Sequence, residues 1–327
     1  MAFTSKFTFA PAEWLPFRDT EVLDRAAMAD IREYQGKIFE NPQFEMKVVG
    51  DVHNFFTIDL FQRMRMSDVK NEKVVLVLPS PENAVFVNVA ELINRHNVSC
   101  RNVHIFFLFE FANEKGEVAP WQSPFSRSGH FMRHFYQRVR ESLRMPMENI
   151  HFWTKENVNT YSDELASLGG ADMAYTTLSW AGGIGAIDAE TFPAKTMDEL
   201  VAMGSRLVTL CPEMSAHESL RGMFGYSGDI ASVPPCAATL GPKNLAAAKD
   251  RMHLQYLTAC GGFPAHQKFP LKLALVGPVC PTNPAAMMRL MSGICYVSND
   301  VAAPVPYEED VDWLVDTINE IREKEEA

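Results

Sequence analysis

The chain of 327 residues has no long apolar run, few cysteines and a shortage of positive charge. No segment approaches the roughly 18 uninterrupted apolar residues of a membrane-spanning helix, so we expect no membrane partner. Lysine and arginine total 30 against 41 aspartate and glutamate, and this net charge of −11 disfavours binding to nucleic acid. The hydrophobic content of 47% is nevertheless typical of a chain with a full globular core.

The six cysteines occur singly, with no C-x-x-C pair and no histidine at the spacing of a zinc site. We therefore predict reduced, mostly buried thiols and no bound metal. The first residues lack a basic segment followed by an apolar run and a cleavage site, so no secretory signal is expected. Both observations favour a cytoplasmic protein. The cysteines are Cys100, Cys211, Cys236, Cys260, Cys280 and Cys295.

Short apolar runs alternate with amphipathic segments, which predicts an α/β fold with an open, mostly parallel sheet. The run at residues 74–79 is uniformly apolar until its final proline, as in a buried parallel strand. In such sheets ligands bind beyond the carboxyl ends of the strands. Other strands are predicted at residues 103–109, 150–153, 173–178, 206–210, 237–240, 253–259, 273–276 and 294–297, and helices at residues 54–64, 83–94, 128–143, 162–168 and 309–325.

The chain is expected to divide into an N-terminal arm, residues 1–45, and one α/β domain, residues 46–327. Within the arm, apolar residues lie near helical spacing between Glu21 and Phe39. A dinucleotide-binding site is not expected, because the glycines from Gly182 to Gly185 lack the third glycine of G-x-G-x-x-G. No other motif indicates a cofactor.

Several stretches, taken in order, resemble the glucosamine-6-phosphate deaminase (isomerase) family, relatives of the 6-phosphogluconolactonases. Residues 129–136 and 145–150 resemble the family's Ser-Phe-Met helix and its Pro-x-Glu-Asn-Ile strand entry. Residues 79–84 stand at the place of its sugar-phosphate loop, and residues 178–190 at its glycine-rich turn. The resemblance covers residues 50–300 approximately.

The family likeness implies a three-layer αβα, modified Rossmann-like fold carrying an N-terminal helical arm. It also implies an amino-sugar or sugar-phosphate substrate, acid–base chemistry without a cofactor, and assembly as a homo-oligomer, which is common in the family. Arg221 matches the family's phosphate-binding arginine, and Lys268 matches a family lysine if an insertion is allowed. The other substrate contacts it implies are Ser80, Asn83, Gly182 and Gly183.

The sequence departs from the family at its proton-transfer residues. Phe109 occupies the position of the family's catalytic aspartate. Gly183 or Gly185 occupies the position of the family's histidine that assists ring opening. Since a phenyl ring takes no proton, acid–base work would fall to other carboxylates. The phosphate loop also departs, because Pro81 removes a backbone N–H and Glu82 adds a negative charge. The remaining candidate acid–base residues are Glu110, Asp188 and Glu190.

These departures leave three hypotheses open. The protein could be an isomerase or deaminase acting through the three carboxylates, although Asp188 and Glu190 could equally be turn or helix-capping acids. It could be a catalytically inactive relative that binds a sugar derivative as a sensor or partner subunit. It could also use a changed reaction with His130, His217 or His266 as proton carrier, although a lone histidine is often structural. His130, His134 and Arg138 would share a helix face that is either an anion site or a solvated or subunit-contact surface.

Overall fold

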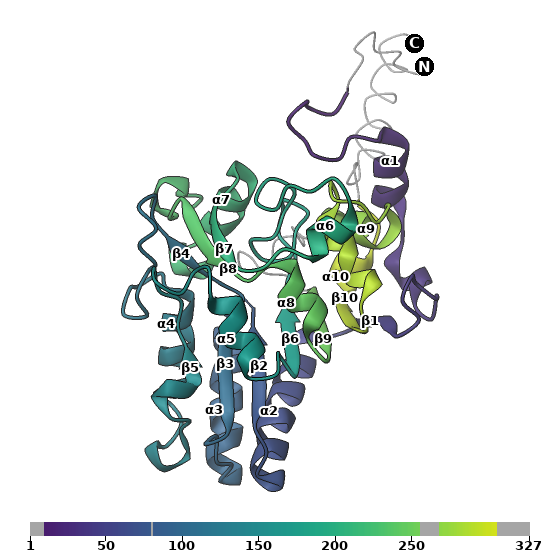
Figure 1. Cartoon of the computed structure of the whole chain (residues 1–327). Coiled ribbons are helices and arrows are strands. Elements are labelled where there is room, and N and C mark those ends of the chain that lie inside the picture. The colour runs from purple at the N-terminus through teal and green to yellow at the C-terminus, as the bar shows by residue number, and fades with distance from the viewer. Residues whose placement is uncertain (1–9, 80, 256–267, 306–327) are drawn as a thin grey trace, which may run out of the picture.

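The computed structural model describes residues 10–79, 81–255 and 268–305, which form two sheets flanked by helices (Figure 1). The strands are β1 (Phe44–Val49), β2 (Val74–Leu78), β3 (Val103–Phe107), β4 (Phe109–Ala112), β5 (Ile150–His151), β6 (Met173–Thr176), β7 (Arg206–Thr209), β8 (Cys236–Thr239), β9 (Arg251–Gln255) and β10 (Gly293–Ser298). Seven of them pair in parallel in the order β1-β10-β9-β6-β2-β3-β5. The prediction of an α/β fold with a mostly parallel sheet is confirmed.

Helices connect the strands of the large sheet. The α-helices are α1 (Thr20–Met28), α2 (Val52–Lys70), α3 (Asn83–His96), α4 (Arg127–Phe131), α5 (Tyr161–Ser167), α6 (Met197–Val201), α7 (Pro212–Ser219), α8 (Pro242–Ala247), α9 (Lys268–Val276) and α10 (Asn299–Ala302). Short helical turns are η1 (Ile31–Tyr34), η2 (Met132–Tyr136), η3 (Glu141–Leu143), η4 (Met147–Asn149), η5 (Gly222–Phe224), η6 (Ile230–Ser232) and η8 (Pro284–Leu290). Of these, η2 is a π-helical continuation of α4.

The central strand β2 sets the position of the carboxyl edge. All five of its residues are buried, as expected for a Val/Leu strand covered on both faces. Its neighbours are β3 on one side and β6 on the other. The chain leaves β2 toward β3 and leaves β6 toward β9, in opposite directions, so a topological switch point lies between β2 and β6. Ligands of open α/β sheets bind at such a point.

A small antiparallel sheet, β4-β8-β7, covers part of this edge. One residue, Leu108, separates β3 from β4. Its backbone N–H donates to the Leu78 carbonyl, and its carbonyl accepts from the backbone N–H of Leu240. Figure 1 shows it above the carboxyl ends of β3 and β5. The prediction at residues 103–109 therefore joined two strands that belong to different sheets.

The N-terminal arm packs on α9 through α1 and is held by two buried cations. The Lys272 ammonium donates to the carbonyl groups of Ala29 and Ala302. Arg289 donates to the carboxylate of Glu40 at 2.6 Å and to three carbonyl groups at the end of α9. Burial lowers the pKa of Lys272 to about 8. The expected boundary after residue 45 falls inside β1.

Two further predictions were wrong. Residues 273–276, expected to be a strand, lie in helix α9, because a short apolar run suits a buried helix as well as a buried strand. The helix expected at residues 128–143 ends at Tyr136 and continues as turns.

The helix expected at residues 309–325 and the end of the strand expected at 253–259 lie outside the described residues. Four of the five described cysteines are buried free thiols, and Cys280 is half-buried.

The buried His253 gives the fold a definite response to acid. Its Nδ1 lies 2.6 Å from the Thr176 hydroxyl, and burial lowers its pKa from the ordinary 6.5 to about 3. Below pH 6.5, His253 therefore takes up a proton in the unfolded chain but stays neutral in the folded protein. The contribution of His253 to the free energy of unfolding is fully present above pH 6.5. It falls by about 1.4 kcal/mol per pH unit as the pH falls below this value.

We predict that His253→Gln makes the fall in unfolding free energy between pH 6 and pH 4 shallower by about this amount, as measured by urea denaturation. His96→Gln, a change at an exposed histidine, is the control and should keep the wild-type slope. Identical slopes in wild type and His253→Gln would show that His253 does not supply this response.

Candidate functional site

Two cavities lie beside the switch point, one at the loop after β2 and one at the loop after β6. The first, here named the arginine cavity, has a volume of about 310 Å³. It is lined by His53, Pro81, Glu82, Asn83, Ala84, His130, Arg221, Gly222, Met223 and Tyr226. The second, here named the arm cavity, has a volume of about 730 Å³ and lies between the N-terminal arm, the glycine-rich turn after β6 and α9. In the described residues the two cavities share no lining residue.

Arg221 reaches the arginine cavity from a buried ion-pair network. One oxygen of Glu218 accepts from Arg127 at 2.7 Å, and the other accepts from Arg221 Nε at 3.1 Å. Arg127 is fully buried, and its guanidinium lies 3.7 Å from the centre of the Phe109 ring. Although burial opposes ionisation of Glu218, the two guanidinium groups lower its pKa to about 2. One carboxylate thus bridges two guanidinium groups, and the Glu110 carboxylate lies close to the same network because it accepts the backbone N–H of Arg127.

The loop from β2 to α3 brings a helix amino terminus to the same cavity. Asn83 is the first residue of α3, a helix of 14 residues, and both Asn83 and its neighbour Glu82 line the cavity. Glu82 does not cap the helix, because its side chain accepts no hydrogen bond from the first turn. Its carboxylate lies 3.6 Å from Nε2 of His53 instead. This contact raises the pKa of His53, because the Glu82 carboxylate stabilises the charged imidazolium.

His130 faces Asn83 across the cavity wall. Its Nδ1 lies 2.9 Å from the amide oxygen of Asn83, which can only accept, so the proton belongs on Nδ1 and the lone pair on Nε2. The Nε2 atom is buried and has no hydrogen-bond partner among the described residues. Burial, with Arg133 beside it, lowers the pKa of His130 to about 4, so the ring is neutral at pH 7. The expected neighbour His134 stacks on it at 5.7 Å, whereas Arg138 follows the helical segment.

Both oxygens of the Glu110 carboxylate accept hydrogen bonds from groups at the start of α4. It accepts the backbone N–H groups of Arg127 and Ser128, at 2.9 and 2.8 Å, and the hydroxyl groups of Ser126 and Ser128. It lines neither cavity. A carboxylate with both oxygens occupied in this way positions α4, and with it Arg127 and His130.

Asp188, Glu190 and Gly182 line the arm cavity rather than the arginine cavity. Asp188 is buried, accepts two backbone N–H groups of its own turn on Oδ1, and has the Cys211 thiol 3.8 Å from Oδ2. Burial raises the pKa of Asp188. Gly183 packs beneath the turn, where a Cβ atom would lie 2.0 Å from the carbonyl oxygen of Ile187, so only glycine fits there.

The other candidate residues lie apart from the arginine cavity or outside the described residues. Lys268 begins α9 and lines neither cavity. His217 stacks on Trp180, a residue of the arm cavity, with ring centres 5.3 Å apart. Ser80 and His266 are not among the described residues. Sequence reasoning missed His53 and Tyr226, since nothing in their own segments marks them and only the fold brings them to the cavity.

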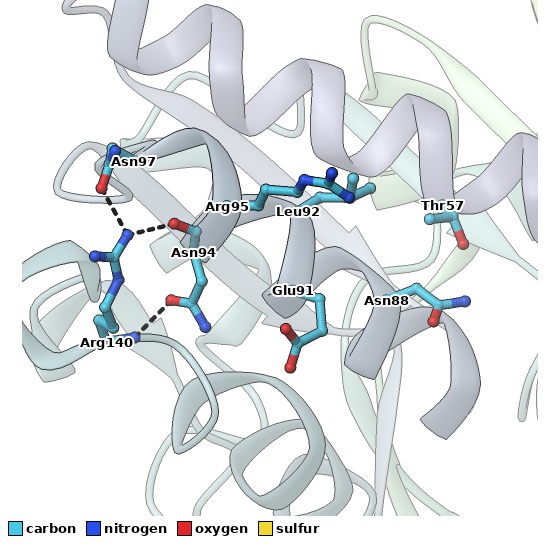
Figure 2. A pocket seen from close by; sticks show the side chains of 8 residues that line it. All are labelled: Thr57, Asn88, Glu91, Leu92, Asn94, Arg95, Asn97 and Arg140. Atoms are coloured by element: carbon cyan, nitrogen blue, oxygen red, sulfur yellow. Dashed lines mark hydrogen bonds between the residues drawn. The ribbon is translucent and has the colours of Figure 1, made fainter.

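A third hollow, of about 880 Å³, lies on the outer surface of α3 (Figure 2). Figure 2 shows Arg140 turned toward Asn94 and Asn97 at one end, with Thr57 and Asn88 at the other. The Arg140 side chain donates to the Asn94 carbonyl and, at 2.6 Å, to the Asn97 amide oxygen. These groups fasten the end of α3 to the loop after η2, so this hollow carries no functional assignment.

In the described part of the chain, no cluster of three or more histidine, cysteine, aspartate or glutamate side chains could hold a metal ion. No described helix combines the length and the apolar character that crossing a bilayer requires.

The ion-pair network makes a testable contribution to stability. We predict that Glu218→Gln lowers the unfolding free energy by about 3–5 kcal/mol, because Arg127 would stay buried and lose the carboxylate that its guanidinium contacts. Adding Arg127→Met should recover part of this loss. Urea denaturation measures both effects, with the exposed Glu72→Gln as control. A loss below about 1 kcal/mol would contradict the role given to Glu218.

Comparison with known proteins identifies the fold. No family model and no curated protein matches the chain. A monomeric glucosamine-6-phosphate deaminase matches with a TM-score of 0.60 and 17% identity, over 79% of this chain and 98% of that one. A 6-phosphogluconolactonase from Thermotoga maritima matches with a TM-score of 0.53 and 14% identity, over 78% and 99%. A 6-phosphogluconolactonase from Plasmodium vivax has the same TM-score at 12% identity, over 86% and 96%.

These matches confirm, at the level of the fold, the resemblance inferred from the sequence. The described chain has the three-layer αβα architecture that glucosamine-6-phosphate deaminases share with 6-phosphogluconolactonases.

Proposed function

We propose that the protein binds a sugar phosphate in the arginine cavity and acts on it by proton transfer, as an aldose–ketose isomerase or deaminase does. The observation that carries the proposal is that Arg221, the amino terminus of α3 and His130 line one cavity. Its volume of about 310 Å³ suits a small ligand. The matched structures are named for enzymes of glucosamine 6-phosphate and of 6-phosphogluconolactone, which are both sugar phosphates.

The phosphate group would lie between Arg221 and the first turn of α3. Arg221, held by Glu218, offers a guanidinium group to the cavity, and a helix amino terminus favours an anion through its free N–H groups and its dipole. Pro81 removes one backbone donor from the loop. Arg221 would therefore contribute a larger share of the phosphate-binding free energy here than it would beside a glycine-rich loop.

Proton transfer would rest on His130, with Asn83 holding its tautomer. A base whose pKa is about 4 is weak at pH 7. A bound phosphate dianion favours the imidazolium form, so binding of the substrate itself would raise the pKa of His130 toward the working range. Glu110 would act as a positioning residue, because its oxygens hold the start of α4.

A catalytically inactive sugar-phosphate binder is the second candidate function. The observation in its favour is that none of the three expected acid–base carboxylates lines the arginine cavity. Glu110 is enclosed at α4, and Asp188 and Glu190 line the other cavity. Binding and turnover therefore need separate measurements.

We predict that Arg221→Met weakens sugar-phosphate binding by about 10- to 100-fold, because a charge-assisted contact is lost. Isothermal titration of glucosamine 6-phosphate and 6-phosphogluconate into both proteins measures this loss. Arg95→Met, a change at an exposed arginine of α3, should leave the affinity unchanged. Equal affinities in wild type and Arg221→Met would place the phosphate elsewhere.

We also predict that His130→Gln takes up fewer protons than wild type when it binds a sugar phosphate at pH 5.5, because the bound phosphate raises the pKa of His130. Titrations in two buffers of different ionisation enthalpy give the number of protons. In assays of ammonia release and aldose–ketose interconversion, the same variant should lose about 10²-fold or more in turnover with little change in affinity. Full turnover in His130→Gln would refute its role as proton carrier, and binding without turnover in wild type would favour the second candidate.

A further inference from the structure

The arm cavity has the composition of a site for an organic cation. Its walls are apolar and partly aromatic, and they come from the N-terminal arm, the turn after β6 and α9. These wall residues are Leu15, Phe17, Leu23, Trp180, Phe269 and Leu273. Its acidic residues are Asp24, Asp188, Glu190 and Glu213, and no lysine, arginine or histidine lines it among the described residues. Such a cavity repels the phosphorylated ligands that suit the arginine cavity.

A buried amide side chain that lines the cavity points independently to a ligand that donates hydrogen bonds. Asn283 is 1% exposed, and its amide nitrogen donates to the carbonyl groups of Leu273 and Pro278, each at 3.0 Å. These two bonds fix the orientation of the amide. Its Oδ1 then has no hydrogen-bond partner among the described residues. A buried acceptor without a donor costs about 1–3 kcal/mol, which a donating ligand would offset.

Asp188 is a second inner acceptor. Its Oδ1 closes the turn by accepting the N–H groups of Glu190 and Thr191, whereas the Cys211 thiol, 3.8 Å away, is the contact of Oδ2. A thiol is a weak donor, so a stronger donor would improve this contact. Burial raises the pKa of Asp188, as expected of a carboxylate that lacks a cation close by.

From the unpartnered Asn283 oxygen, the buried Asp188 carboxylate and the aromatic walls, we propose that the arm cavity binds a primary or secondary organic amine in its ammonium form, with an aromatic or aliphatic body of modest size. The ammonium donates to Asp188 Oδ2 and Asn283 Oδ1. The body packs on Trp180, Phe269 and the arm, where aromatic faces also attract a cation. Glu190 and Asp24, both exposed, lie where they would draw a cation toward the cavity.

This site is separate from the one in the proposed function. The ligand differs in the sign of its charge, and the two sets of lining residues do not overlap. Residues of the arm between Pro11 and Asp24 form one wall, so amine binding would also stabilise the packing of the arm.

The test uses 2-phenylethylamine as the probe, with 2-phenylethanol and phenylacetate as neutral and anionic counterparts of similar shape. Isothermal titration and thermal shift on the full chain should show binding of the amine, at least 10-fold weaker binding of the alcohol, and no binding of the acid. Asp188→Asn should weaken amine binding by at least 10-fold while keeping the turn, because its remaining carbonyl oxygen can still accept from Glu190 and Thr191. Glu72→Gln, at an exposed carboxylate outside both cavities, should leave the affinity unchanged.

A second variant tests the proposal even if Asp188→Asn fails to fold. Leu15→Trp lies in the arm, where Leu15 is half-buried, and should fill the cavity and abolish amine binding without a change in melting temperature of the ligand-free protein. Equal binding of amine and alcohol, undiminished binding in both variants, or no binding of the amine would each overturn the proposal.

Sugar-phosphate binding provides the independent readout. Arg221→Met should leave amine binding intact, and Asp188→Asn should leave glucosamine 6-phosphate binding intact. Failure of one site is then visible while the other still binds.

Discussion

The buried bridge of Glu218 between Arg127 and Arg221 is the interaction on which the carboxyl edge depends. It joins α4 to the end of α7, and it packs beneath Phe109 of the small sheet. Glu110 adds a second tie, from β4 to the start of α4. Together these contacts fix His130 and Arg221 on two walls of one cavity. Arg221 is the arginine of this network that lines the cavity, and for this reason we propose an anionic ligand there.

The switch point explains why the candidate residues separate into two groups. The loop after β2 leads to the arginine cavity, and the loop after β6 leads to the arm cavity. A single extended site would need the carboxylates of the second loop to face the first cavity. Asp188 is instead turned into its own loop and toward Cys211. Asp188 and Glu190 thus line the arm cavity, whereas His130, from α4, lines the arginine cavity together with Arg221. For this reason we propose His130, and not these two carboxylates, as the proton carrier.

The sequence was sufficient for the alternation of strands and helices. Asn83 and Arg221, two of its predicted substrate contacts, line one cavity, and their role stays a prediction. These predictions depend on local patterns, namely the uniform apolar run at β2, the largely apolar run at β3 and a recognisable order of short motifs. It was insufficient at α9, where Leu273 to Val276 form an apolar run that either a buried strand or a buried helix satisfies. It also could not place Glu110, His53 or the arm, because contacts between residues far apart in the chain decide their surroundings. Cys260, Ser80 and His266 lie outside the described residues.

The most direct measurement is a crystal structure of the protein with bound glucosamine 6-phosphate. We expect phosphate oxygens within hydrogen-bond distance of the Arg221 guanidinium and of the first turn of α3, with the sugar ring toward His130. A phosphate bound in the arm cavity, or a sugar bound with its phosphate directed away from Arg221, would contradict this expectation.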